Sequence, residues 1–228
     1  MFLKDFLFPK ICVGCSYLGT YICLKCQKKL KYLEKESCFY CQKPSPYGLI
    51  HFSCQKKYSP DGIMSIFYYN HILKKIIKAA KYKFATEVLK ELFQVIDPQK
   101  IKKLSFFADF KKAALQPVPL HVSKERQRGF NQAKLITSFF QRFLLFPQVD
   151  YLKRKKETKP QAEIKDAKKR YLNIRDAFSV NPKIKVEKDK VIIVVDDIIT
   201  TGLTVFEAVK TLKKAGFEKV FVLTLAKA

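Results

Sequence analysis

The sequence predicts an α/β fold, in which helices flank a mostly parallel sheet, with a small Cys-rich zinc-binding domain at the N-terminus. Two observations lead to this prediction. Strand-like apolar runs alternate with helix-like runs after residue 62, which is the order of a parallel sheet. All seven cysteines lie between residues 12 and 54. We therefore predict a Cys-rich domain at residues 1–58 and the α/β domain at residues 59–228, divided at the turn Ser59-Pro60-Asp61-Gly62.

The first two cysteine pairs form one candidate metal site. Each pair has C-x2-C spacing, which places two thiolates on the same side of a tight turn, and two such turns close a tetrahedron around Zn²⁺. Metal binding supplies folding energy that so short a segment otherwise lacks. Disulfides or free thiols are the alternative, although an odd number of cysteines argues against complete disulfide pairing. The ligands of this first site are Cys12, Cys15, Cys23 and Cys26.

A second candidate metal site has fewer cysteines. Cys38, Cys41 and Cys54 supply three ligands, and Lys57 stands where a fourth cysteine would complete the last pair. His51 precedes Cys54 with the spacing of a mixed knuckle and is the candidate for the fourth ligand. The alternative is a segment that folds around its aromatic neighbours Phe39, Tyr40 and Phe52 without metal. We therefore expect one Zn²⁺ and leave a second one open.

The remaining elements follow from periodicity and turn signals. Strands are predicted at residues 63–70, 113–120, 151–152, 177–180, 191–195 and 220–226, and helices at residues 71–83, 85–96, 132–146 and 205–216. We expect the strands to lie in a parallel sheet with helices on both faces. The basic segment 153–170 is either a lid that closes over a bound ligand or a surface loop that leads into a charged helix.

The stretch 191–204, VIIVVDDIITTGLT, carries the most information about chemistry. A buried strand is followed by a polar turn and a helix, so the backbone N–H groups of the turn Thr200-Thr201-Gly202-Leu203-Thr204 are expected to cradle a phosphate. Asp196 and Asp197 end the strand, where they can accept hydrogen bonds from sugar hydroxyls or orient a hydrated cation. The alternative is a plain capped turn, which needs fewer polar residues.

A second segment supplies candidate ligands for a diphosphate. The loop Pro117-Val118-Pro119 ends a predicted strand and is expected to wrap a diphosphate with backbone N–H groups, while Arg126 and Arg128 add positive charge. Bound Mg²⁺ together with these arginines would stabilise a departing diphosphate. Asn131 and Gln132 complete the candidate ligand set. The alternative is a solvated turn in which Asn131 caps the next helix.

Two families share these motifs. The stretch 191–204 resembles the phosphoribosyl-diphosphate motif of type I phosphoribosyltransferases, with two apolar residues, two acids and T-T-G-x-T. Together with PVPLH at 117–121, RQRGFNQA at 126–133 and the cysteine pairs, the chain resembles the ComF family, whose members are competence-associated. The departure from the family pattern is Lys57. Further matches to the pattern are Leu152, Arg154, Thr158, Gln161, Arg170, Asn173 and Phe178.

The resemblance implies a type I phosphoribosyltransferase-like fold and an enzyme that binds phosphoribosyl diphosphate with Mg²⁺. It assigns the ribose hydroxyls to Asp196 and Asp197 and the 5′-phosphate to the turn 200–204. The family's link to natural transformation implies single-stranded DNA and other competence proteins as partners. The alternative is a non-catalytic protein that uses the transferase fold as a scaffold for handling single-stranded DNA. The sequence carries no readable pocket for an acceptor, and the oligomeric state is left open.

Charge and hydropathy restrict the function less than the motifs do. The formal net charge of +25 attracts polyanions, but only six of the 45 basic residues are arginine and the lysines are spread along the chain, so nucleic-acid contact is left open. No run approaches the roughly 20 apolar residues of a membrane helix, and charges interrupt the first ten residues before a secretory signal can form. We expect a cytoplasmic protein without membrane insertion.

Overall fold

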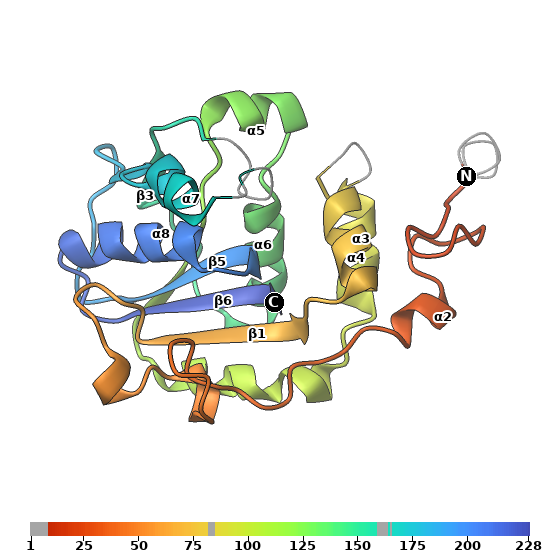
Figure 1. Cartoon of the computed structure of the whole chain (residues 1–228), viewed down its shortest axis with the longest axis horizontal. Helices are drawn as coiled ribbons and strands as arrows, with labels where there is room; N and C mark the ends of the chain where they lie inside the picture. Colours follow the sequence, from red (N-terminus) through yellow and green to blue (C-terminus); the bar gives the residue numbers. More distant parts are fainter. Residues whose placement is uncertain (1–8, 82–84, 159–163, 165) are drawn as a thin grey trace.

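A parallel sheet forms the centre of the computed structural model, which describes residues 9–81, 85–158, 164 and 166–228 (Figure 1). The sheet has four strands in the order β1-β6-β5-β2, and all neighbouring pairs are parallel. This arrangement confirms the predicted α/β fold. The strands are β1 (Gly62–Tyr68), β2 (Ala113–Pro117), β5 (Val191–Ile199) and β6 (Val220–Lys227).

Helices cover both faces of the sheet and give the protein two hydrophobic cores. In β5, Ile193 and Val195 point into one core, while Ile192 and Val194 point into the other. This alternation follows from the two-residue period of a strand, and it explains why the run is apolar throughout. The helical elements are α3 (His71–Ala79), α4 (Ala85–Gln94), η3 (Pro98–Asp109), α5 (Val122–Arg128), α6 (Gln132–Leu144), α7 (Ala167–Ile174) and α8 (Leu203–Lys214).

Two of the predicted strands lie outside the main sheet. The strands β3 (Leu152–Arg154) and β4 (Phe178–Val180) pair with each other in antiparallel fashion and form a separate two-stranded sheet. Their apolar residues Leu152 and Phe178 are buried in the core beneath α8. The apolar pattern therefore predicted the burial of these residues correctly. It does not indicate which strand pairs with which, and the expectation that the two strands join the parallel sheet was wrong.

The boundaries of the two central strands also differ from the prediction. β5 continues to Ile199, because β6 extends far enough to pair with it: Asp196 lies opposite Thr224 and Ile198 lies opposite Ala226. The two acids therefore lie within the strand instead of ending it. β2 stops at Pro117, and the residues that follow leave the sheet. The 3₁₀ segment η3 was not predicted, and its residues Leu104 and Phe107 are buried.

The N-terminal segment protects the edge strand β1. Isolated antiparallel bridges join Tyr32 to Phe67 and Leu49 to Gly62, so backbone groups at this edge are paired within the chain. Figure 1 shows the segment, in red to orange, passing along β1. Its short helical elements are α2 (Leu24–Gln27), η1 (Pro46–Gly48) and η2 (Phe52–Cys54). Among the described residues, no helix has both the length and the apolar character needed to cross a bilayer.

Candidate functional site

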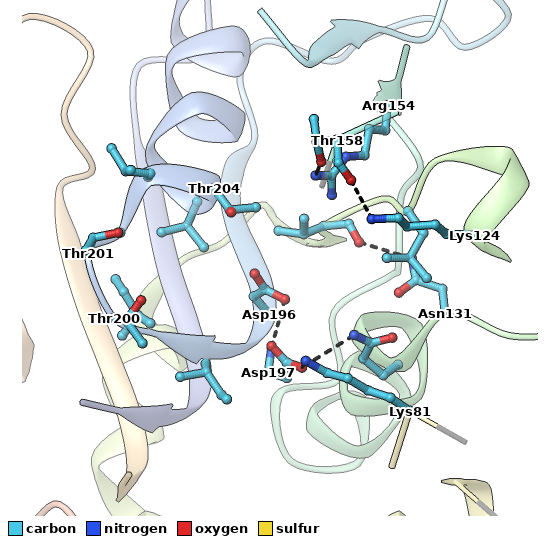
Figure 2. A pocket seen from close by; sticks show the side chains of 18 of the residues that line it. Lys81, Lys124, Asn131, Arg154, Thr158, Asp196, Asp197, Thr200, Thr201 and Thr204 are labelled. Carbon is cyan, nitrogen blue, oxygen red and sulfur yellow. Dashed lines mark hydrogen bonds and ion pairs between the residues drawn. The ribbon is translucent and has the colours of Figure 1, made fainter. Parts of the chain in front are cut away.

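A cavity of about 300 Å³ lies where the parallel strands end (Figure 2). Tyr69 follows β1, Val118 follows β2, and Asp196 belongs to the last part of β5, and all three line this cavity. Open α/β sheets bind their ligands at the carboxyl ends of the strands. Residues 200–205, from the turn and the start of α8, form one wall. The cavity is therefore a candidate ligand site built from several distant segments.

The turn 200–204 presents the N-terminus of α8 to the cavity. Gly202 precedes the helix in the left-handed conformation, with φ of 75°. A Cβ atom at this position would lie 2.6 Å from Cζ of Phe206, so any side chain here would be both strained and in collision. The first backbone N–H groups of a helix lack partners within the helix and carry partial positive charge. This wall is suited to an anion such as phosphate.

The acid pair lies beside this wall. The backbone N–H of Asp197 donates to the Asp196 carboxylate at 2.9 Å, and Lys81 approaches the Asp197 carboxylate at 3.7 Å. Burial, together with the Asp197 charge, raises the pKa of Asp196 to about 8. The pair thus lacks full compensation by positive charge. Such a pair fits hydroxyl donors or a hydrated Mg²⁺, which prefers oxygen ligands.

Gln132 and Asn131 support the site more than they face a ligand. Gln132 donates to the Asp197 carboxylate at 3.4 Å and accepts from Arg128 at 3.1 Å, so it links a cation to the acid pair. The Asn131 amide donates to the Val118 carbonyl at 3.0 Å, and its oxygen caps α6 by accepting from the N–H of Ala133 at 2.9 Å. The cap that the alternative interpretation required is therefore present, and Asn131 also holds the loop after β2.

A cationic wall faces the turn 200–204 across the acid pair. Figure 2 shows Lys124, Arg154 and Thr158 on this side, opposite Thr200, Thr201 and Thr204. Arg154 donates to the hydroxyl of Thr158 and lies over the ring of Phe178, 5.4 Å from its centroid. Its buried Nε has no hydrogen-bond partner among the described residues. Burial lowers the pKa of Arg154, the Asp196 charge opposes this, and the Arg128 charge adds to it.

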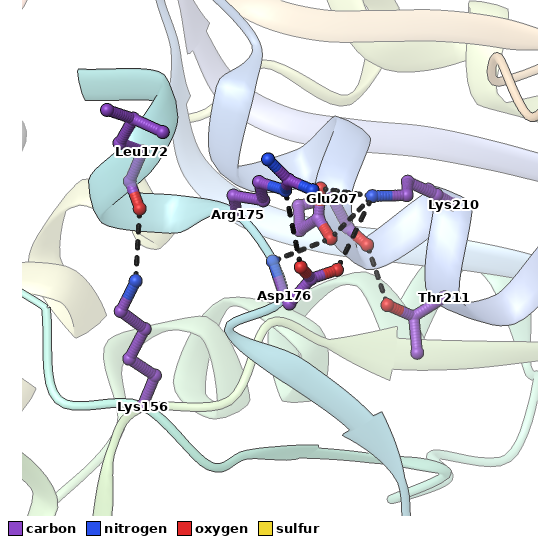
Figure 3. Close-up of polar contacts among 7 residues, drawn as sticks. All are labelled: Lys156, Leu172, Arg175, Asp176, Glu207, Lys210 and Thr211. Atoms are coloured by element: carbon purple, nitrogen blue, oxygen red, sulfur yellow. Dashed lines mark hydrogen bonds and ion pairs between the residues drawn. The ribbon is translucent and has the colours of Figure 1, made fainter. Parts of the chain in front are cut away.

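Contacts with three helices hold the segments around this wall. Lys124 of α5 donates to the backbone carbonyl of Thr158. Figure 3 shows the other anchor, in which Glu207 of α8 accepts from the backbone N–H of Asp176 at 3.0 Å and pairs with Lys210 at 3.1 Å. Lys156 reaches the Leu172 carbonyl at 3.0 Å and ties the start of the segment 153–170 to α7. Residues 159–163 and 165 of this segment, including Gln161, lie outside the described residues.

The structure does not bring all of the predicted ligands to the cavity. Most of them line it, but Arg126, Pro117 and Pro119 are absent from its described lining. Arg126 lies on α5 between Lys124 and Arg128, which are four residues apart and share the face toward the cavity. The backbone N–H of Val118 donates to the Val195 carbonyl at 2.9 Å, and Pro117 and Pro119 have no backbone N–H. The loop 117–119 therefore offers no free N–H to a diphosphate.

Sequence reasoning missed several lining residues. Tyr69, Lys81, Leu120 and Lys124 were not predicted for the site, although all four line the cavity. Leu120 belongs to the PVPLH segment, whereas Tyr69, Lys81 and Lys124 come from separate segments and carry no motif of their own. Arg154 was noted as part of the family pattern and lies in the basic segment 153–170.

The first cysteine cluster has the geometry of a metal site. One ligand atom from each of its four cysteines lies within 4.8 Å of every other. Burial opposes ionisation of Cys12, but backbone N–H groups, that of Cys23 first, outweigh this effect and lower its pKa to about 6, whereas burial and the neighbouring thiols raise the pKa of Cys26 to about 12. A thiolate is the form that binds zinc. The cluster is anchored to α3 through Lys75, which donates to the Gly14 carbonyl at 2.9 Å, and to α4 through Glu91.

The second cluster includes His51. Its ligand atoms and those of Cys38, Cys41 and Cys54 also lie within 4.8 Å of one another. His51 Nδ1 lies 3.2 Å from the Cys41 sulfur, and Nε2 lies 3.2 Å from the Pro44 carbonyl. With the proton on Nε2, that nitrogen donates to the carbonyl, and Nδ1 offers its lone pair to a metal. Lys57 instead lies over the ring of Tyr58. The donor set fits Zn²⁺.

Comparisons with known proteins agree with both parts of the structure. The family model of the phosphoribosyl transferase domain matches residues 145–228, and that of the double zinc ribbon domain matches residues 3–55. Competence protein F of Haemophilus influenzae is 30% identical over 91% of this chain and 90% of its own length. The chain belongs to the ComF family. Another member, Competence protein ComFC of Bacillus subtilis, is 24% identical over 86% of this chain and 79% of its own length.

Membership of the ComF family accounts for the two cysteine clusters and the transferase-like fold together. Competence protein ComFC of Streptococcus pneumoniae is 24% identical over 90% of this chain and 87% of its own length. The two domain matches leave residues 56–144 between them. The predicted boundary between residues 58 and 59 of this ComF protein therefore stays a prediction.

Proposed function

We propose that the protein binds phosphoribosyl diphosphate with Mg²⁺ and transfers its phosphoribosyl group to an acceptor. The observation that carries this proposal is the acid pair Asp196 and Asp197, held in one cavity between the N-terminus of α8 and a cationic wall. The helix N-terminus, the acid pair and the cationic wall follow one another in the same order as the 5′-phosphate, the ribose diol and the diphosphate of the ligand. The single cavity of about 300 Å³ suits a ligand of that type.

Each wall would have a separate task in the reaction. The turn 200–204 binds the 5′-phosphate, and the acid pair accepts hydrogen bonds from the ribose hydroxyls. Arg128, Arg154 and Lys124 stabilise the diphosphate as the bond between it and the anomeric carbon breaks. The acceptor forms the new bond to that carbon and releases its proton. Mg²⁺ bound with the diphosphate would neutralise charge that develops on the leaving group.

Calorimetric titration of the full chain with phosphoribosyl diphosphate tests the proposal. We expect saturable heat with a stoichiometry of one per chain in the presence of Mg²⁺, and weaker binding when the Mg²⁺ is chelated, because fewer charges then offset the diphosphate. Ribose 5-phosphate serves as the matched ligand that lacks the diphosphate. Absence of heat in all conditions would contradict the proposed function.

The proposal includes one Zn²⁺ in each cysteine cluster. Both donor sets fit a tetrahedral zinc site, and His51 supplies the ligand that the cysteine count lacks. The metals would stabilise the N-terminal segment, because the free energy of metal binding contributes to the free energy of folding.

A role in natural competence, with single-stranded DNA and other competence proteins as partners, is a further part of the proposal. All three relatives are named competence proteins. The ribbon segment also exposes aromatic side chains, with Phe52 93% and Tyr17 64% exposed. Exposed rings on a protein with a net charge of +25 suit stacking on bases and attraction to phosphates. A scaffold without turnover remains the alternative to catalysis in this role.

Substitution of these two aromatic residues tests whether they contact DNA. We expect Tyr17→Ala combined with Phe52→Ala to weaken binding of an oligothymidine by roughly 10-fold or more, since stacking contributes about 1–3 kcal/mol per base. Affinity of the parent protein should fall steeply with salt. Fluorescence anisotropy of a labelled oligonucleotide measures both effects. Binding that changes with neither the two substitutions nor salt would exclude this partner.

A further inference from the structure

Three aromatic side chains connect the second cysteine cluster to the start of α8, directly after the turn 200–204. We infer that this cluster sets the position of the turn 200–204, and that Phe39, Tyr40 and Phe206 are the positioning residues that connect them. The ligand of the cluster is Zn²⁺, so occupancy of this site and affinity for phosphate at the turn are coupled. The phosphate part of the inference rests on the proposed function, whereas the connection between cluster and turn does not.

The first step of the connection is a group of three aromatic rings. Phe39 and Tyr40 stand between Cys38 and Cys41, at the tip of the knuckle. The ring of Phe39 meets that of Phe206 edge to face, with centroids 5.0 Å apart, and Tyr40 stacks on the same ring at 5.9 Å. Aromatic pairs in these arrangements stabilise a contact beyond the area that they bury. The knuckle therefore holds the ring of Phe206 from two sides.

The second step joins Phe206 to the turn. Phe206 is in the first turn of α8, and its backbone N–H donates to the Gly202 carbonyl at 2.8 Å. Its ring covers Gly202 so closely that a Cβ there would lie between 2.6 and 3.1 Å from three ring atoms. A displaced ring would leave Gly202 uncovered and would loosen the N-terminus of α8. The position of the phosphate-binding N–H groups thus depends on the ring of Phe206.

The shape of the knuckle depends on its ligands. The turn is closed by the N–H of Gln42, which donates to the Cys38 carbonyl at 2.9 Å, and Gln42 adopts a left-handed φ of 58°. That conformation is costly for a residue other than glycine, so the turn needs further support. Sulfur ligands on a shared metal supply such support by fixing both ends of the knuckle. Loss of the metal would therefore free Phe39 and Tyr40 to move.

A second contact carries the same coupling. Lys227, the last residue of β6, donates to the hydroxyl of Ser37 at 3.0 Å and lies 5.9 Å from the centroid of Phe39. Lys227 is paired in the sheet with Ile199, directly before the turn. The knuckle is thus tied to the phosphate-binding turn through both β6 and α8.

The first cluster provides a matched control. It is anchored to α3 and α4, through Lys75 and Glu91, whereas the aromatic contacts of Phe206 within the described part of the chain are with the knuckle of the second cluster. Coupling between two ligands is reciprocal, so phosphate at the turn should also raise the zinc affinity of the second cluster, but not that of the first.

Hydrogen–deuterium exchange of the ligand-free, zinc-loaded full chain tests the connection. We expect His51→Ala to lower zinc content from two ions to one and to raise exchange in residues 199–206 by about tenfold, as expected for the loss of aromatic contacts. Phe39→Ala should raise exchange in the same residues while both zinc ions remain bound. Cys15→Ala should lower zinc content equally and leave exchange in residues 199–206 unchanged.

Two results would overturn the inference: unchanged exchange in Phe39→Ala, or an equal rise in Cys15→Ala. Phe39→Ala keeps all metal ligands, so it gives an answer even if His51→Ala fails to fold. Titration with ribose 5-phosphate adds the ligand readout, for which we expect about tenfold weaker binding in Phe39→Ala than in the parent. A parent protein that binds no ribose 5-phosphate but shows the expected exchange pattern would contradict the proposed function and still support the connection.

Discussion

Replacing both carboxylates of the acid pair, by Asp196→Asn with Asp197→Asn, is expected to weaken binding of phosphoribosyl diphosphate with Mg²⁺ by about 100-fold or more. Each hydrogen bond from a hydroxyl to a charged group contributes roughly 1.5–3 kcal/mol, and the amides lose the charge on which both bonds depend. The substitutions also replace two charged carboxylates by neutral amides, which are weaker oxygen ligands for a hydrated Mg²⁺. Calorimetric titration at fixed Mg²⁺ measures the change.

A matched control separates this effect from the change in net charge. Asp150→Asn with Asp189→Asn removes the same two charges from positions outside the lining of the cavity, where Asp150 pairs with Lys134 and Asp189 pairs with Lys112. We expect this variant to bind phosphoribosyl diphosphate with the affinity of the parent. Equal loss of affinity in both variants would contradict the assignment of the ribose hydroxyls to Asp196 and Asp197.

Thermal unfolding of the ligand-free protein gives a second test of the acid pair. We expect the buried charge of Asp196 to lower the stability of the folded state. The pKa of Asp196 is raised to about 8, so the folded state holds this proton more tightly than the unfolded state, whose carboxyl has a pKa of about 3.9. The stabilising contribution of the proton is therefore lost as pH rises from about 4 to about 8. Asp196→Asn should raise Tm relative to the parent, and more at pH 8.5 than at pH 5. A lower Tm at both pH values would contradict this cause.

The part of the site that lies within one stretch of sequence could be predicted. Residues 191–204 contain a strand, two acids and a helix start in consecutive order, and local patterns determine all three. The same reasoning located β2 and its following loop. It could not show that the N–H of Val118 is taken by Val195, because that bond depends on which strand lies next to β2.

The cationic wall could not be predicted, since tertiary structure alone brings its members together. Lys124 comes from α5 and Arg154 from β3, and each resembles any other surface cation in the sequence. The pairing of β3 with β4 was also out of reach, because an apolar pattern indicates burial but names no partner strand. The family pattern contributed Arg154 and Thr158 without a role for either.

The second cysteine cluster shows an intermediate case. Spacing proposed His51 as a ligand but left a metal-free segment equally open. The orientation of the ring is compatible with the ligand role, because Nδ1 lies beside the Cys41 sulfur and Nε2 lies beside the Pro44 carbonyl. Sequence reasoning also noted Phe39 and Tyr40, but only as possible packing residues within the segment. Their contact with Phe206 connects residues that are far apart in the chain.

Replacing Arg154 of the cationic wall, by Arg154→Leu, is expected to have the second large effect on ligand affinity. We expect this variant to bind phosphoribosyl diphosphate and inorganic diphosphate about 10- to 100-fold more weakly, since a charge-assisted hydrogen bond contributes about 1.5–3 kcal/mol. Arg154 is held near another cation, and its Nε lacks a partner among the described residues. An arginine in these surroundings is costly without an anion, and a diphosphate would supply both the charge and the acceptor oxygens.

The choice of ligand makes this prediction specific to one end of the site. Ribose 5-phosphate lacks the diphosphate, so its affinity should stay within about threefold of the parent value in Arg154→Leu. Arg126→Leu makes the same chemical change on α5 but outside the described lining of the cavity, and it should leave both affinities unchanged. If Arg154→Leu weakened both ligands equally, Arg154 would maintain the shape of the whole cavity and would not bind the diphosphate. If Arg126→Leu weakened diphosphate binding as much as Arg154→Leu, general charge attraction would explain the effect better than a defined contact.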